Sequence, residues 1–353
     1  MMFELVTMFT AALAFIIVAA TMPWFIRKMH EKKLTARDMH KPNAPEIANN
    51  GGVLVLFVVF ALIITIPIIF RLVNRLANQE LFDRDPMEID TALLLIMLLY
   101  AFYGVLDDYI DVGRISKALI PLLFSYPLIL VLSGWDPWIP GVGAISINSY
   151  YVDLPWGGQL TGSAFVRYII APVFIMVVAN LKNMHSGFNG LQTGCAFIIM
   201  VTIFLKAGYE GHINGMLTTA ALVGATLAFL LYNTYPARIF EGNIGSLAIG
   251  GTLGAIIISQ HYIWAGFVML LPHTFNFMLY AYWRIQMWRR PGDPRYASAK
   301  FARVREDGTI EPPNPYTLKW ILPYHFRMTE RQATYAMYVV TGVFCILGFM
   351  IPG

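Results

Sequence analysis

The chain has 353 residues, of which 57% are hydrophobic and only 13% are charged, and its mean hydropathy is +0.59. Soluble domains carry roughly 25% charged residues, so this composition excludes an ordinary soluble protein. The net charge of +4 indicates little by itself, but the placement of the basic residues sets the expected topology. Cys195 and Cys345, the two cysteines, lie inside apolar stretches and are expected to be buried thiols rather than a disulfide or a metal pair.

Ten apolar segments follow one another along the chain, each near the roughly 20 residues that a helix needs to cross the hydrocarbon core. They lie at about 3–26, 52–72, 91–106, 115–133, 164–182, 191–207, 214–233, 244–260, 262–285 and 332–351. No basic stretch precedes the first segment, which is long enough to span, so no cleavable signal peptide is expected. We predict a single polytopic domain over residues 1–353, an all-α integral membrane protein with about ten transmembrane helices.

The lysine and arginine residues are distributed unevenly between the two sets of loops. Of the 25 basic residues, 20 fall in one set and 5 in the other. The basic set is predicted to be cytoplasmic because positive loops are retained on that side. It comprises the loops near residues 27–50, 107–117, 183–190, 234–243 and 286–331. With ten spans, both termini are then expected outside, and a site built from these loops is expected to face the cytoplasm.

Adjacent carboxylates, Asp107 and Asp108, end the third apolar segment. They repel each other at the membrane boundary, and they therefore need a cation, a proton or a basic partner. A magnesium–diphosphate site fits, because Mg²⁺ prefers oxygen ligands. The alternative is a solvated helix end, which the helix dipole disfavours for acidic residues. The acidic pattern continues to Asp111 and also matches the Asp-rich motifs of intramembrane prenyltransferases.

Three further polar loops fall on the same predicted side. The segment 180–191 carries paired asparagines among glycines, which suits contact with a ligand or an ordinary turn. The segment 232–246 enters the eighth apolar segment through a Gly-x-x-Gly pattern, which indicates either a phosphate site at a helix start or a start capped by Asn243. The long basic loop 286–331 is predicted to be a lid over an anionic substrate, although topology alone explains its charge.

Four motifs, in this order, resemble those of the polyprenyl-phosphate N-acetylhexosamine-1-phosphate transferase superfamily, glycosyltransferase family 4. Gly104–Asp108 with Lys117 is similar to GxxDD…K, Asn180–Leu191 to NxxNxxxGxNGL, Tyr235–Asn243 to YPxxxFxGD and Pro272–Phe277 to PxxFNF. The resemblance runs over nearly the whole chain and is closest to the dolichyl-phosphate N-acetylglucosaminephosphotransferase branch, archaeal relatives included. The family fold also has ten spans with both termini outward.

The resemblance implies a phosphotransferase reaction of the EC 2.7.8 class. N-acetylglucosamine-1-phosphate, or a related hexosamine phosphate, passes from a UDP-sugar to dolichyl or polyprenyl phosphate, and UMP is released. Such a reaction opens N-glycan or surface-glycan assembly. The implied cofactor is Mg²⁺, or Mn²⁺ in its place.

The family motifs also imply roles for individual residues. The catalytic group is Asp107, Asp108 and Lys117, the metal ligands are Asn183 and Asn243, and the substrate-binding residues are Gly187, Asn189, Arg238, Lys300, Arg303 and Arg305. Asn243 stands where the family has an aspartate, and its amide oxygen contributes no charge. The substrate diphosphate, or the neighbouring Glu241, would then have to supply more.

The expected partners are the UDP-sugar, the lipid phosphate and the bilayer, without nucleic acid, and the sequence leaves a homodimer open. The expected location is the plasma membrane in a prokaryote or the endoplasmic reticulum in a eukaryote. Two other functions stay open. A prenyltransferase would need a second acidic motif on the same side, whereas Asp83, Asp85 and Asp90 map outside. A transporter would need ionisable residues at mid-helix, and the segments have almost none.

Overall fold

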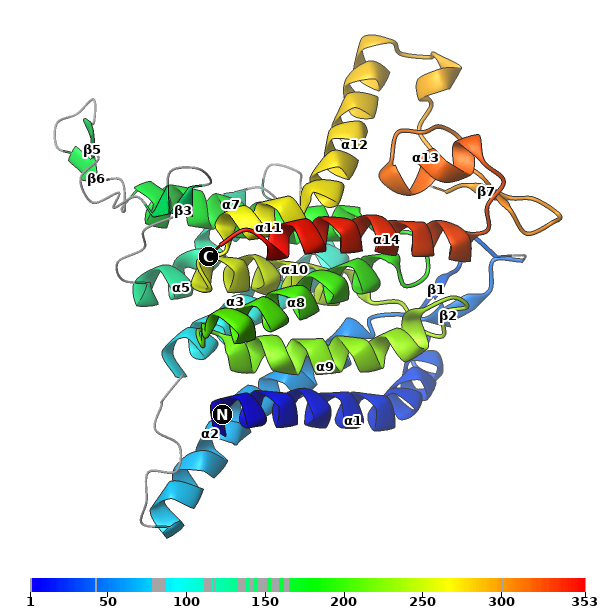
Figure 1. The fold of residues 1–353 in the computed structure, drawn as a ribbon. Helices are drawn as coiled ribbons and strands as arrows, with labels where there is room; N and C mark the ends of the chain where they lie inside the picture. The colour runs from blue at the N-terminus through cyan, green and yellow to red at the C-terminus, as the bar shows by residue number, and fades with distance from the viewer. Residues whose placement is uncertain are drawn as a thin grey trace.

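The computed structural model describes residues 2–41, 43–77, 87–110, 116, 119–132, 138–139, 143–144, 151–153, 159–161, 165–299 and 301–352. Within these residues the chain forms a bundle of helices (Figure 1), which confirms the predicted all-α class. The long helices are α1 (Met2–Glu31), α2 (Gly52–Ala77), α3 (Met87–Ile110), α7 (Ala171–Met184), α8 (Leu191–Glu210), α9 (Met216–Asn233), α10 (Gly242–Ser259), α12 (Leu271–Arg289) and α14 (Glu330–Phe349). The short ones are η1 (Ile120–Ser125), α5 (Tyr126–Val131), the π-helix η3 (Val166–Ile170), α11 (Ile263–Met269), η4 (Pro294–Tyr296) and α13 (Leu318–His325).

Eight of the described helices are long and apolar enough to cross a membrane, and α11 with α12, bent by 59°, would form a ninth. These nine coincide with nine of the ten predicted segments. The remaining segment, 115–133, lies partly outside the described residues and contains a shorter apolar helix over Ile120–Val131. The protein is thus an integral membrane protein, whereas ten crossings and outward termini stay predictions.

Helix α10 lies at the centre of the bundle, and every residue of Gly245–Ser259 is buried. Glycines let the neighbouring backbones come close to it, as is common for helices packed in lipid. A Cβ atom on Gly104 of α3 would lie 2.7 Å from Cα of Ile244. A Cβ atom on Gly250 would lie 2.9 Å from Cα of Ala179 in α7. These close approaches bring the ends of α3 and α7 to the start of α10.

Small antiparallel hairpins connect some of the helices. Their strands are β1 (Thr35–Arg37) with β2 (Glu46–Ala48), β3 (Trp138–Ile139) with β4 (Gly143–Ala144), β5 (Tyr151–Asp153) with β6 (Gln159–Thr161), and β7 (Arg303–Val304) with β8 (Ile310–Glu311). The segment after β2 docks on the start of α10. There the backbone N–H of Gly51 donates to the carbonyl of Phe240 at 2.8 Å, and that of Gly52 donates to Glu241 at 2.9 Å.

The two ends of the bundle carry different parts of the chain. Figure 1 shows both chain termini at one end, and the β1–β2 hairpin, β7 and α13 at the other. Helix α12 rises away from the bundle at a steep angle to α14. The first and last loops that the sequence marks as cytoplasmic therefore lie together.

Candidate active site

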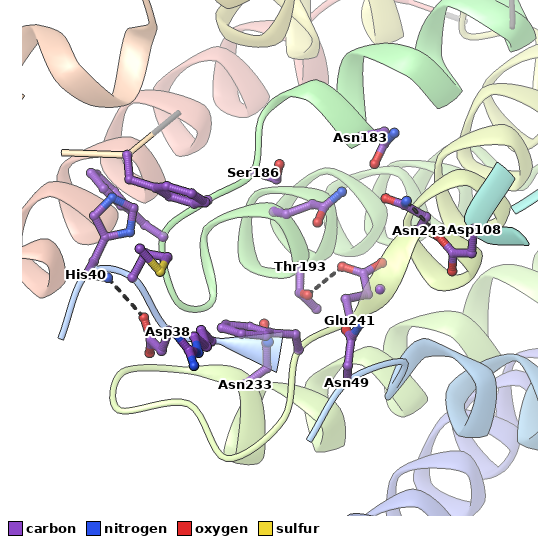
Figure 2. A pocket seen from close by; sticks show the side chains of 18 residues that line it. Asp38, His40, Asn49, Asp108, Asn183, Ser186, Thr193, Asn233, Glu241 and Asn243 are labelled. Carbon is purple, nitrogen blue, oxygen red and sulfur yellow. Dashed lines mark hydrogen bonds between the residues drawn. The ribbon is translucent and has the colours of Figure 1, made fainter. Parts of the chain in front are cut away.

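A pocket of about 290 Å³ opens where α3, α7 and α10 meet the β1–β2 hairpin and the loop after α7 (Figure 2). Most of its lining residues are polar. They comprise Arg37, Asp38, Met39, His40, Asn49, Asp108, Asn183, Ser186, Gly187, Phe188, Gln192, Thr193, Asn233, Phe240, Glu241, Gly242, Asn243 and Phe301. Three of the four motifs marked by the sequence thus contribute to one cavity.

Asp108 and Asn243 meet at one side of this pocket. Asp108 lies on the last turn of α3, and Asn243 lies on the first turn of α10. Nδ2 of Asn243 donates a hydrogen bond of 2.8 Å to Oδ1 of Asp108. The amide nitrogen is thereby committed to the carboxylate, and Oδ1 of Asn243 is the end that remains for a ligand. Asp107 belongs to the same turn of α3 but is not among the lining residues.

Asn183, near the end of α7, is held beside this pair (Figure 2). Its Oδ1 accepts a 2.6 Å hydrogen bond from Oγ of Ser246 on α10. A carbonyl oxygen has two lone pairs, so one is left for another partner. With Asp108 and Asn243, the pocket offers one carboxylate and two amide oxygens, the donor types that hard divalent cations prefer. The residues present therefore fit the metal that the family motifs imply.

Glu241, which lines the pocket, forms a buried ion pair with Lys182, which does not. Nζ of Lys182 lies 2.5 Å from Oε1 of Glu241, and both side chains are almost fully buried. The second carboxylate oxygen accepts a 2.7 Å hydrogen bond from Oγ1 of Thr193. Buried charges are stable only when they are paired and hydrogen-bonded. The charge of Glu241 is thus already compensated, and this carboxylate is not a free replacement for the missing metal-ligand aspartate.

A second network joins the amino-terminal loop to the carboxy-terminal helix. Nζ of Lys41 forms an ion pair with Glu330, the first residue of α14, and lies 3.3 Å from Oδ2 of Asp38. Oε1 of Glu330 accepts a 2.6 Å hydrogen bond from the backbone N–H of Asn189. Nδ2 of Asn189 donates to Asp38 at 3.1 Å, and its Oδ1 accepts from the backbone of Ala237 at 2.9 Å. Asn189 is therefore buried and internally bonded, and it does not line the pocket.

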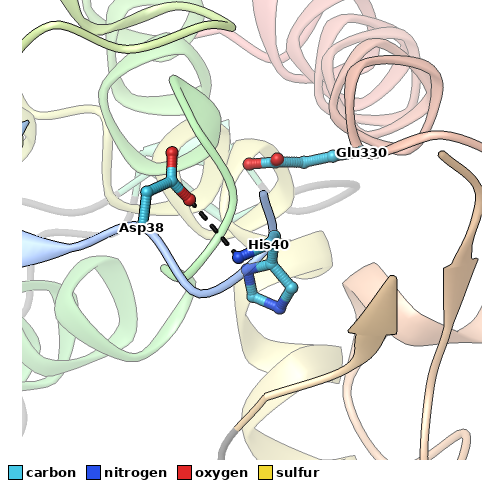
Figure 3. Close-up of side chains that lie close together, drawn as sticks. All are labelled: Asp38, His40 and Glu330. Carbon is cyan, nitrogen blue, oxygen red and sulfur yellow. Dashed lines mark hydrogen bonds between the residues drawn. The ribbon is translucent and has the colours of Figure 1, made fainter. Parts of the chain in front are cut away.

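His40 lies close to two of these carboxylates, and Figure 3 shows it with Asp38 and Glu330. One ligand atom from each of the three falls within 4.8 Å of the others, a geometry that resembles a metal site. The ammonium group of Lys41 already pairs with both acids. Nε2 of His40 accepts from the backbone N–H of Ala302 at 3.3 Å. The cluster is thus a link between loops in which one ammonium group pairs with two carboxylates.

The imidazole of His40 also closes one side of the pocket. Its ring packs edge-on against Phe188, with 5.1 Å between centroids, and against Phe301 at 5.9 Å. Burial, with help from the charge of Lys319, lowers the pKa of His40 to about 4. The ring is therefore neutral near pH 7. A neutral ring between two aromatic side chains serves as an apolar wall and a hydrogen-bond acceptor.

The other predicted substrate-binding residues are placed differently. Gly187 lines the pocket. Arg238 lies outside the pocket, and its Nη2 donates a 3.0 Å hydrogen bond to the carbonyl of Leu231. Arg303 is exposed on β7. Nη1 of Arg305 donates a 2.9 Å hydrogen bond to the carbonyl of Ile310 within the same hairpin. Lys117 and Lys300 lie outside the described residues.

The amino-terminal loop contributes residues that the sequence reasoning missed. Arg37, Asp38, His40 and Asn49 all line the pocket. That loop was read as topology alone, because its basic charge sufficed for the positive-inside pattern. The available signal was the mixture of acid, imidazole and guanidinium within four residues, which topology does not require.

Comparison with known proteins bears on the whole chain. The model of glycosyl transferase family 4 matches residues 91–261. A Saccharolobus solfataricus protein, named as a candidate UDP-N-acetylglucosamine–dolichyl-phosphate N-acetylglucosaminephosphotransferase, is 25% identical over 96% of this chain and 94% of its own. A Sulfolobus acidocaldarius protein of the same name is 27% identical over 84% of this chain and 80% of its own length. A phospho-N-acetylmuramoyl-pentapeptide-transferase of Streptococcus equi subsp. zooepidemicus is 29% identical over 73% of this chain and 74% of its own length. These likenesses, together with the motifs that meet in one pocket, support the assignment of this chain to glycosyl transferase family 4.

Proposed function

We propose that this protein transfers N-acetylglucosamine-1-phosphate from UDP-N-acetylglucosamine to dolichyl or another polyprenyl phosphate, with release of UMP. The observation that carries the proposal is the meeting of Asp108, Asn183 and Asn243 in one pocket. These residues end or begin three different helices, and each belongs to a different family motif. The names of the two archaeal relatives agree with this substrate pair.

The chemistry needs charge neutralisation and in-line placement more than covalent help. An oxygen of the lipid phosphate attacks the phosphorus that carries the sugar, and the bond from this phosphorus to the UMP oxygen breaks. Asp107 and Asp108 position the acceptor or take its proton. The second pKa of a phosphate monoester is about 6, so the acceptor is mostly dianionic near pH 7 and a general base is of secondary importance. When bound, Mg²⁺ or Mn²⁺ neutralises the diphosphate, with Asn183 and Asn243 as ligands.

Arg37 is proposed as a further donor-binding residue. It lines the pocket from β1, and its guanidinium has no ion-pair or hydrogen-bond partner among the described residues. The other lining charges are mostly compensated, since Glu241 pairs with Lys182 and Asp38 with Lys41. A free guanidinium is well suited to a phosphate, because it can bind two oxygens at once.

The loop 286–331 is proposed to close over the donor. Phe301 lines the pocket, which places one part of this loop at the site. Lys300 and Arg303 flank that position in sequence, and Arg305 follows on the same hairpin. Lys117 is proposed to neutralise a phosphate. Gly187 is proposed to let the donor approach the backbone of the pocket wall, with Asn189 and Arg238 supporting the surrounding loops.

The single-domain organisation, the cytoplasmic side of the site, ten crossings and a homodimer belong to the same proposal. The basic loops support the cytoplasmic assignment. The plasma membrane of an archaeon is the location that agrees with the archaeal relatives. The prenyltransferase alternative loses support at Asp90, whose Oδ1 accepts from the backbone and the hydroxyl of Thr218 at the start of α9. Release of UMP from a labelled UDP-sugar panel tests the proposal.

A further inference from the structure

Lys319 approaches the pocket wall from behind, although it is not one of the lining residues. It lies on α13, and its Nζ donates a hydrogen bond to the carbonyl of Ser186. Nζ also lies 5.5 Å from the ring centroid of Phe188. A Cβ atom on Gly187 would collide with the same Nζ. One ammonium group therefore contacts three successive residues, 186–188, all of which line the pocket.

The surroundings of Lys319 lack a direct counter-charge. No carboxylate lies within ion-pair distance of Nζ in the part of the chain that the structure describes. The acid that acts on it is Glu330 of α14, which is already bound by Lys41 and by the backbone of Asn189. Two imidazoles face it, His40 from the amino-terminal loop and His185 from the end of α7. Burial lowers the pKa of both rings, so neither competes as a cation near pH 7.

The fourth family motif, Pro272–Phe277, holds Lys319 in place. Oδ1 of Asn276 on α12 accepts a 2.8 Å hydrogen bond from the backbone N–H of Leu318, the first residue of α13. His273, one turn earlier, packs edge-on against His185 with 4.6 Å between ring centroids. Helix α12 thus supports the loop after α7 twice, once directly and once through α13. This gives the motif a structural task in a chain where it does not line the pocket.

We propose that Lys319 is a positioning residue, whose ammonium group sets the conformation of the 186–188 wall and thereby the affinity for the sugar-nucleotide donor. The proposal rests on the proposed function only in taking UDP-N-acetylglucosamine as the donor. A charge-assisted hydrogen bond to Ser186 and a cation over Phe188 both depend on the positive charge. A neutral amine would keep the hydrogen-bond donor but would hold the wall less firmly.

The charge of Lys319 is sensitive to mildly alkaline pH. Burial lowers its pKa from 10.5 to about 8, and Glu330 opposes this shift. The charged form therefore predominates below pH 8 and is lost above it. The lipid phosphate does not titrate in this range, because its second pKa is about 6. A rise of donor KM between pH 7 and 9 that is absent from Lys319→Arg therefore reports on Lys319.

The test compares Lys319→Met, Lys319→Arg and wild type in donor KM, acceptor KM and kcat across that pH range. Lys319→Met removes the charge and should raise donor KM roughly tenfold at pH 7, with a smaller effect on acceptor KM and kcat. Its donor KM should no longer depend on pH. Lys319→Arg keeps a charge that does not titrate, so its donor KM should stay flat to pH 9. Arg331→Met, which removes one exposed charge from α14, should behave like wild type.

A second readout does not depend on catalysis. Amide hydrogen exchange of a peptide that covers 184–192 should be faster in Lys319→Met than in wild type or Arg331→Met. Wild-type donor KM that is constant from pH 7 to 9, or unchanged exchange in a correctly inserted Lys319→Met, would overturn the proposal. If Lys319→Met does not insert, the comparison of Lys319→Arg with wild type decides alone. Total absence of transfer in wild type would instead contradict the proposed function. The exchange measurement would then still test whether Lys319 holds the 186–188 segment.

Discussion

Oδ1 of Asp108 accepts a 2.8 Å hydrogen bond from Nδ2 of Asn243, and this bond joins the end of α3 to the start of α10. It fixes the orientation of the Asn243 amide. Asp108 therefore faces an amide here and not a second carboxylate. The family aspartate could not make the same bond in its ionised form, because it has no proton to donate. The metal site of this chain is thus expected to carry less negative charge than a site with aspartate at position 243.

The metal requirement should respond to residue 243 in both directions. Asn243→Asp adds a charged ligand and should lower the Mg²⁺ concentration for half-maximal UMP release, whereas Asn243→Ala should raise it. EDTA should abolish turnover in all three proteins. Mn²⁺ binding, followed by electron paramagnetic resonance, should change in the same order. An identical metal dependence in both variants would show that Asn243 does not contact the ion.

Asn183 and Asn189 should fail in different ways when each is changed to alanine. Asn183 faces the pocket and has one side-chain hydrogen bond, from Ser246, so Asn183→Ala should lower kcat and cost less stability than Asn189→Ala. Asn189 is buried with both ends of its amide bonded, so Asn189→Ala should mainly destabilise, by about 1–3 kcal/mol. Thermal unfolding in detergent and kinetics on folded protein separate the two. Equal losses of stability would argue against this division.

The buried Lys182–Glu241 pair should show strong coupling in a double-mutant cycle. Glu241→Gln or Lys182→Met alone leaves one uncompensated buried charge and should destabilise the protein by roughly 3–5 kcal/mol. The double variant should be more stable than either single one, since both charges are gone. Chemical or thermal unfolding of the four proteins measures this. Additive losses would mean that the pair is not coupled.

The basic residues at the pocket and on the lid should differ from those that serve topology alone. Arg37→Gln, Lys300→Ala and Arg303→Ala should each raise donor KM or lower turnover, by about 1.5–3 kcal/mol per lost phosphate contact. Lys32→Gln, on the same loop as Arg37 and exposed like it but outside the pocket lining, is the matched control. Membrane insertion should be intact in all four, because topology has many redundant charges. Wild-type kinetics in Arg37→Gln would remove it from the donor site.

Much of the fold and part of the site could be predicted from the sequence. Apolar segment length located nine spans, because the bilayer imposes one length on every crossing helix. The local motifs indicated Asp108, Asn183 and Asn243, since each is a polar residue at a helix end. Such patterns are short-range, and a linear reading detects them.

The rest of the site depends on contacts between distant segments. Lys41 and Glu330 are 289 residues apart, and Lys319 and Ser186 are 133 apart. No periodicity encodes such pairs, and each residue taken alone looks like a topology charge or a surface acid. Lys182, at the edge of a predicted cytoplasmic loop, likewise looks like a topology charge in the sequence, although it lies buried against Glu241. Only the packing of α13 and α14 against the loop after α7 shows what these residues do.

The central claim is tested most directly by supplying purified protein with Mg²⁺, UDP-N-acetylglucosamine labelled in the sugar, and either dolichyl or undecaprenyl phosphate. The account predicts one UMP for each labelled lipid diphosphate-sugar, preference for dolichyl phosphate, and no product from Asp108→Asn protein that is correctly inserted. Use of undecaprenyl phosphate alone would contradict the branch assignment. Labelled lipid without UMP, or no labelled lipid with any UDP-sugar in the panel, would contradict the proposed reaction itself.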